Sequence, residues 1–161
     1  MTKPLEEVLG EKLREHGLRL AVAESCTGGL VGHRLTNIAG SSTYYVGSVT
    51  AYAYEAKVRL LGVTWETLEK YGAVSAETVT EMARGVRRSL AADVGIAVSG
   101  IAGPGGGMPG KPVGLVWMAV SAKDDTMTRK WNFKGDRIAV KEQAAEMALQ
   151  IGIDYLDKKV K

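Results

Sequence analysis

The chemically distinctive stretch of the chain is residues 23–29, Ala-Glu-Ser-Cys-Thr-Gly-Gly, where a serine lies between two regular patterns. An apolar run over 18–22 precedes it, and a helical pattern over 30–35 follows it. A strand that turns into a helix directs backbone N–H groups toward one point, where an anion or a developing oxyanion is favoured. This predicts that Ser25 is a nucleophile. The alternative is that Ser25 or Thr27 only caps the helix, which is the commoner role of such residues.

Cys26 is a second possible nucleophile in this stretch, although a free cysteine is more often a small buried apolar residue. Gly28 and Gly29 allow a ligand to approach the backbone closely. The stretch is neither a Gly-x-Ser-x-Gly elbow nor a P-loop, because no Lys-Ser/Thr follows the glycines.

A serine nucleophile needs a base. His16 ends a predicted helix, where the helix dipole explains a cation, and His33 lies two turns beyond the serine, too far along to reach its hydroxyl. Lys57 is different because its neighbours at i±3 and i±4 in the predicted helix 53–61 are all apolar or aromatic. Burial disfavours the charged form of a lysine, and a neutral amine is a workable base. The pattern equally allows Lys57 to bury its stem and keep its ammonium in water.

Three further features could contact a ligand. Tyr52 ends the strand that leads to Lys57. Its position allows it to orient the base or to bind a ligand. The alternative is that it packs in the core, which is the commoner role of an aromatic residue at the end of a strand. The loop 99–112 is too long and too rich in glycine for a simple connection, and its three prolines favour a shaped anion-binding loop over a flexible lid. Lys111 in this loop and Arg137 at a helix start add positive charge, although both residues suit an exposed surface.

The elements that position these residues alternate between helix and strand for two thirds of the chain and then form a hairpin. Strands are predicted at 18–23, 44–52, 94–99, 115–122 and 126–133. Helices are predicted from about 5 to 16, after Ser25 to about 38, at 53–61, at 65–71, from Ser75 to about 90 and from Asp136 onward. This order predicts a three-layer α/β/α sandwich with a mixed, mostly parallel sheet of about five strands, in a single domain over residues 1–161.

Composition narrows the class of protein. The chain has 161 residues, one cysteine and a net charge of +3, with its basic residues scattered rather than striped. We therefore expect a cytoplasmic protein with no disulfide, no membrane association and no nucleic-acid partner. No cluster of His, Cys and carboxylate has the spacing of metal ligands, so no metal or cofactor is expected.

The motifs together resemble the CinA C-terminal domain family, which includes PncC-type nicotinamide-nucleotide amidohydrolases. The shared segments occur in the same order over nearly the whole chain: residues 23–29, 40–42, 55–57, 60–63, 72–75, 100–106, 111–114 and 133–137. The family fold is a three-layer α/β/α domain, and its members are often dimers. The resemblance therefore implies a homodimer.

The resemblance also implies an activity, the hydrolysis of nicotinamide mononucleotide to nicotinate mononucleotide and ammonia in pyridine-nucleotide salvage. Ser25 matches the family nucleophile, Lys57 matches its base, and Tyr52 falls in its active-site strand end. The remaining positions are expected to bind the nucleotide: Cys26, Thr27, Gly28, Gly29, Ser42, Gly100, Ile101, Gly103, Gly105 and Arg137.

One segment departs from the family. Where relatives commonly have Tyr-Ser-Asn, this chain has Tyr52-Ala53-Tyr54, so two polar side chains near the base are replaced. This departure motivates a second hypothesis, a nucleotide-binding or regulatory module without catalysis. A third, a DNA-associated competence or damage protein, rests only on the family name and the basic pI.

Overall fold

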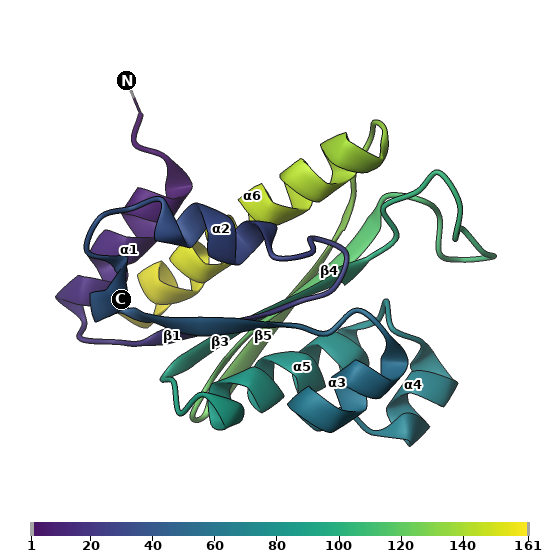
Figure 1. Ribbon diagram of the computed structural model, residues 1–161, viewed down its shortest axis with the longest axis horizontal. Coiled ribbons are helices and arrows are strands. Elements are labelled where there is room, and N and C mark those ends of the chain that lie inside the picture. The colour runs from purple at the N-terminus through teal and green to yellow at the C-terminus, as the bar shows by residue number, and fades with distance from the viewer. Residues whose placement is uncertain (1, 161) are drawn as a thin grey trace.

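A five-stranded sheet in the order β2-β1-β3-β4-β5 forms the middle layer of the protein. The computed structural model describes residues 2–160 (Figure 1). Strand β1 pairs in parallel with β2 and β3, whereas β4 is antiparallel to both β3 and β5. The mixed sheet and the terminal hairpin confirm the predicted fold class. The strands span Leu20–Glu24 (β1), Tyr45–Thr50 (β2), Val94–Gly100 (β3), Leu115–Ala122 (β4) and Asp125–Asn132 (β5).

Helices cover both faces of the sheet, three on each (Figure 1). Side chains alternate along a strand, so Leu20 and Val22 of β1 pack on one face while Ala21 and Ala23 pack on the other. One face carries α1 (Leu5–Glu15), α2 (Leu30–Thr36) and α6 (Arg137–Val160), and the other carries α3 (Tyr54–Leu61), α4 (Trp65–Tyr71) and α5 (Ala76–Ser89).

Helix starts agree with the sequence in two places and differ in one. Ser75 accepts a hydrogen bond from the Thr78 N–H at 3.2 Å, and Asp136 accepts one from the Ala139 N–H at 2.9 Å, so both predicted caps are confirmed. The helix predicted to follow Ser25 does not follow it directly but begins at Leu30. A turn precedes it, in which Gly28 (φ +60°) and Gly29 (φ +104°) adopt left-handed conformations that suit glycine.

The three parallel strands end at one edge of the sheet, where open α/β sheets bind ligands. Glu24 pairs with Thr50 of β2 and Val98 of β3, so the turns that follow these strands are neighbours. The short 3₁₀ helix η1 (Ser41–Thr43) precedes β2 and therefore lies at the opposite edge. Within residues 2–160, none of the helices has the length and apolar character needed to cross a membrane.

Candidate active site

Lys57 and Ser25 meet in the interior at the carboxyl edge of the sheet. Lys57 is fully buried, which confirms its inward position on α3 and shows that its ammonium does not reach water. Its Nζ lies 2.9 Å from Ser25 Oγ, and Ser25 itself is only 7% exposed. Ser25 follows β1 and Lys57 lies on the helix after β2, so the parallel pairing of these two strands brings the pair together.

The partners of Lys57 suit both of its protonation states. Besides the serine hydroxyl, its Nζ contacts the Ala51 carbonyl oxygen at 2.8 Å and the Tyr52 carbonyl oxygen at 2.9 Å. An ammonium donates to all three oxygens. A neutral amine donates to the two carbonyls and turns its lone pair to the Ser25 hydroxyl, which then donates to it. Proton transfer between Ser25 and Lys57 therefore requires no change of partners.

The electrostatic setting of Lys57 favours the neutral amine. Burial lowers its pKa from 10.5 to about 8, because the ammonium loses the water around it and the opposing effect of Cys26 is smaller. Burial acts in the opposite direction on the neighbouring thiol and raises the pKa of Cys26 to about 11. Cys26 is therefore a protonated, buried thiol, and Ser25 is the better candidate for the nucleophile.

Glu24 occupies the start of α2, where the sequence predicted a free anion site. Its side chain is fully buried. Its carboxylate accepts hydrogen bonds from the N–H groups of Gly29 (3.2 Å), Val31 (2.9 Å) and Gly32 (3.0 Å) and from the Thr27 hydroxyl (2.6 Å). These are the amides that a helix start would otherwise offer to a ligand. The chain's own carboxylate therefore takes the amides of Gly29, Val31 and Gly32, and an anion or oxyanion at this turn would have to bind elsewhere on it.

Two N–H groups of the turn donate to no other residue within the part of the chain that the structure describes. The Ser25 N–H donates to the Val98 carbonyl and the Gly28 N–H donates to the Ser25 carbonyl, both at 3.1 Å. The N–H groups of Cys26 and Thr27 have no acceptor on another described residue. They belong to the residues directly after the nucleophile, a usual position for oxyanion donors.

Arg137 and Tyr52 join three segments at the mouth of the site. Arg137 donates to the Gly103 carbonyl oxygen at 2.7 Å and to the Tyr52 hydroxyl at 3.2 Å. The Tyr52 side chain is 62% exposed, so its interpretation as a core aromatic is wrong. Tyr52 holds the base through its backbone carbonyl, while its ring remains available at the surface.

The glycine-rich loop is shaped, as predicted, and projects beyond the end of the sheet (Figure 1). Its base is fastened by hydrogen bonds between the backbones of Ile101 and both Gly114 and Leu115, and its tip by a bridge between Met108 and Lys111. Lys111 Nζ donates to the carbonyl of Tyr71 at the end of α4. The amine thus fastens the loop to α4.

The other predicted ligand residues divide into three groups. Gly100 and Ile101 form the base of the loop at the correct edge, and Gly105 is exposed farther along it. Thr27 is 1% exposed and directs its hydroxyl to Glu24, so its side chain is not available to a ligand. Ser42 lies in η1 at the opposite edge of the sheet, and the structure does not bring it to the site.

Sequence reasoning missed two residues near the nucleophile. Glu24 received no role of its own, although an acidic residue at the end of an apolar strand is itself a signal of a buried polar partner. Lys141 lies one turn into α6 and lines a pocket with the 27–29 turn. No local pattern indicated this, because α6 and the turn are more than a hundred residues apart.

Comparison with known proteins agrees with this architecture. The family model described as CinA C-terminal domain matches residues 2–156. CinA-like proteins of Kosmotoga olearia and Salinibacter ruber are 48% and 49% identical to the chain over 145 and 146 residues, which are 90% and 91% of its length. The solved structure of the competence/damage inducible protein CihA of Agrobacterium tumefaciens aligns with a TM-score of 0.91 and 36% identity, covering 98% of this chain and 99% of that one.

The fraction of each relative that the match covers differs between the two CinA-like proteins and the Agrobacterium protein. The chain spans 35% of the length of each of the two CinA-like proteins, whereas it covers nearly all of the Agrobacterium chain. The family match over residues 2–156 and the shared fold lead to one conclusion: this chain belongs to the CinA C-terminal domain family.

Proposed function

We propose that the protein is a serine–lysine amidohydrolase that converts nicotinamide mononucleotide to nicotinate mononucleotide and ammonia. The observation that carries the proposal is the buried contact of 2.9 Å between Lys57 Nζ and Ser25 Oγ, with the pKa of Lys57 lowered to about 8. A lysine with this pKa is partly neutral near physiological pH and can accept the serine proton. The family resemblance supplies the choice of amide.

In the proposed first half-reaction, neutral Lys57 takes the proton of the Ser25 hydroxyl as Oγ attacks the carboxamide carbon. The N–H groups of Cys26 and Thr27 donate to the oxyanion that forms. Collapse of the tetrahedral intermediate breaks the C–N bond, and the Lys57 ammonium returns its proton to the leaving nitrogen. Ammonia departs and an acyl ester remains on Ser25.

In the second half-reaction, water attacks the ester carbon and Lys57 accepts one of its protons. The bond to Ser25 Oγ breaks, the Lys57 proton passes to the serine oxygen, and the carboxylic acid product leaves. The Ala51 and Tyr52 carbonyls hold Nζ in place through both steps, since they accept hydrogen bonds from the amine and from the ammonium alike.

The test is ammonia release from nicotinamide mononucleotide by the wild-type chain and by Ser25→Ala and Lys57→Ala. We expect turnover in the wild type and none above background in either variant. Full activity in either variant would rule out the dyad.

Saturable binding of the mononucleotide without turnover, across a pH series, would instead favour the non-catalytic binding module. The observation that favours this second candidate is Tyr54, which stands where relatives commonly have a polar residue near the base. Its ring is exposed and packs against Trp65, with the ring centroids 6.3 Å apart.

A further inference from the structure

A pocket of about 390 Å³ opens directly beside the turn that follows the nucleophile. The 27–29 turn and Leu30 form one wall, and the first two turns of α6 form the other, with His33 at its margin. The Gly28 N–H donates to the Ser25 carbonyl, so the wall of this pocket is continuous with the backbone of the nucleophile. A ligand group in this pocket would lie beside the residues that directly follow the nucleophile along the chain.

Lys141 extends across this pocket toward bare backbone. A Cβ atom on Gly28 would lie 3.8 Å from Lys141 Nζ, so the absence of a side chain at Gly28 keeps the space beneath the ammonium open. Among the residues that the structure describes, no acceptor or carboxylate pairs with Lys141. Its charge nevertheless acts on the turn, where it lowers the pKa of Cys26 against the larger effect of burial.

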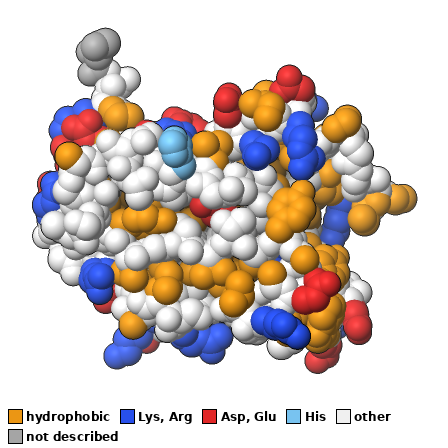
Figure 2. Space-filling view, viewed as in Figure 1, with side chains coloured by type: hydrophobic (Ala, Val, Ile, Leu, Met, Phe, Trp, Pro, Cys, Tyr) orange, Lys and Arg blue, Asp and Glu red, His pale blue; other side chains and the backbone are white. Residues whose placement is uncertain are grey.

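The other cations at this edge already have protein partners. Lys57 donates to three oxygens in the interior, and Arg137 donates to Gly103 and Tyr52. Lys111 is fastened to Tyr71. Figure 2 shows Lys and Arg side chains beside the first turns of α6, with Asp and Glu side chains close to them.

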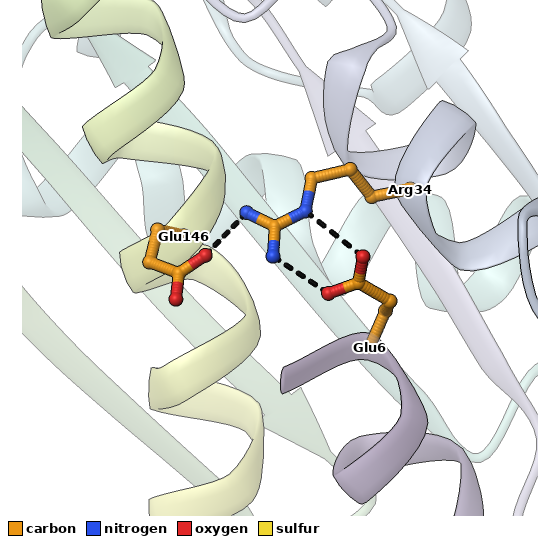
Figure 3. A network of polar contacts seen from close by, with 3 residues as sticks. All are labelled: Glu6, Arg34 and Glu146. Atoms are coloured by element: carbon orange, nitrogen blue, oxygen red, sulfur yellow. Dashed lines mark hydrogen bonds and ion pairs between the residues drawn. The ribbon is translucent and has the colours of Figure 1, made fainter. Parts of the chain in front are cut away.

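The nearby carboxylates do not cancel this charge. Glu146 is bound by Arg34 at 2.5 Å, and Arg34 also holds Glu6 at 2.6 Å, so this network is complete without Lys141 (Figure 3). Glu24 faces inward to the amides of α2. Glu142 lines the pocket but is exposed to water, where its attraction for a neighbouring lysine is weak.

We infer that Lys141 binds an anionic group of the substrate, a phosphomonoester, in the pocket over Gly28 and Gly29, with His33 as a second donor at its margin. This inference rests on the proposed function and deepens it, because it assigns the two ends of the nucleotide. The carboxamide lies at Ser25 and the phosphate lies at Lys141. Arg137 donates to the loop and to the Tyr52 hydroxyl, whereas Lys141 is the cation that faces this pocket.

The experiment compares nicotinamide mononucleotide with nicotinamide riboside, which carries the same amide without the phosphate. Binding is measured by calorimetry on the Ser25→Ala protein, so that the result does not depend on turnover. We expect the mononucleotide to bind at least about tenfold more tightly than the riboside, the effect of one charge-assisted contact. Lys141→Gln in the same background should remove this difference and leave riboside binding unchanged.

Two matched variants make the result specific. Lys141→Arg should retain most of the preference for the mononucleotide. Lys123→Gln removes the same charge from the β4–β5 turn at the opposite edge of the sheet, and it should change nothing. The inference is overturned if Lys141→Gln weakens both ligands equally, if it leaves the preference intact, or if Lys123→Gln acts as strongly.

The same variants separate this inference from the proposed reaction. In the chain with Ser25 intact, Lys141→Gln should raise KM for the mononucleotide about tenfold and leave kcat unchanged. A wild-type chain that binds the mononucleotide in preference to the riboside through Lys141, yet releases no ammonia, would refute the amidohydrolase and retain the phosphate site. Turnover of both compounds with equal kcat/KM would refute the phosphate site and retain the hydrolase.

Discussion

Two turns follow neighbouring parallel strands, and a fully buried charged side chain from the adjoining strand or helix is bound at each: Glu24 from the end of β1 and Lys57 from α3. In the β1–α2 turn, Glu24 receives four hydrogen bonds, three of them from backbone N–H groups. In the β2–α3 turn, Lys57 contacts two backbone carbonyls and one hydroxyl. Both turns satisfy a charged side chain with backbone, but only one of them leaves a partner that can exchange a proton.

The difference assigns a separate task to each turn. The donors around Glu24 are amides and a hydroxyl that lose no proton near neutral pH, so the carboxylate fixes the shape of the turn that presents Ser25. Around Lys57 the third partner is Ser25, whose hydroxyl either accepts from the ammonium or donates to the amine. Glu24 therefore fixes the conformation of the β1–α2 turn, whereas Lys57, held by the β2–α3 turn, exchanges a proton with Ser25.

The largest expected effect is that of Lys57→Met on turnover. An apolar side chain of similar length removes the base, and we expect kcat to fall by about 10²–10⁴-fold. Stability should change little, because the variant no longer buries a charge but leaves the Ala51 and Tyr52 carbonyl oxygens without their donor. Ammonia release and urea unfolding measure the two effects, with Lys123→Met as the matched control. A Lys57→Met protein that is active but poorly folded would reverse the assignment of tasks.

The second effect is on stability and concerns Glu24. Glu24→Ala leaves the N–H groups of Gly29, Val31 and Gly32 without an acceptor, and we expect a loss of about 3 kcal/mol or more in the free energy of unfolding. Glu24→Gln is the sharper probe. Its amide oxygen can replace the Oε1 atom that serves three donors, but its NH₂ group cannot accept from Gly32.

Urea unfolding should therefore rank the three proteins as wild type, Glu24→Gln and Glu24→Ala, in order of decreasing stability. An Ala variant within about 1 kcal/mol of the wild type would show that water satisfies these donors, and that the carboxylate does not shape the turn.

The sequence indicated Lys57 more clearly than Glu24 for a physical reason. Lys57 lies on a helix, where apolar residue types at i±3 and i±4 indicated an inward face. Lys57 is buried as expected, but of these four neighbours only Leu61 is buried with it, and Ala53, Tyr54 and Leu60 are exposed. The partners of Glu24 are backbone N–H groups, which every residue except proline carries, so no residue type in the sequence marks them.

Contacts between distant segments were the other part that the sequence did not provide. The strand and helix order was sufficient to predict the layers, the mixed sheet and the edge where the turns meet. The contacts of Arg137 with Gly103 and Tyr52 depend on how α6 crosses the sheet. Ser42 is an example of a prediction that failed in the same way. It belongs to a segment shared with the family, but η1 precedes β2 and therefore lies at the edge of the sheet opposite to Ser25.

The pH dependence of turnover tests the reactive turn alone. With the pKa of Lys57 at about 8, kcat/KM should rise about tenfold per pH unit below that value and level off above it. The folded pKa lies below the unfolded value of 10.5, so the unfolded chain binds more protons between these values. Stability should therefore increase as pH rises from about 8 to 10.5, and Lys57→Met should lack this increase. A flat rate profile between about pH 6 and 8 would contradict the role of Lys57.

The smallest expected effect distinguishes Arg137, at the mouth of the site, from Arg34, away from it. Arg137→Met releases partly exposed acceptors that water can satisfy, so we expect less than about 1 kcal/mol of lost stability. KM should nevertheless rise, because the loop and the Tyr52 ring lose their connection. Arg34→Met leaves the largely buried Glu6 carboxylate without its partner and should cost about 1–3 kcal/mol without changing KM. If both variants changed KM equally, Arg137 would act through stability, and the position of its guanidinium at the mouth would have no functional consequence.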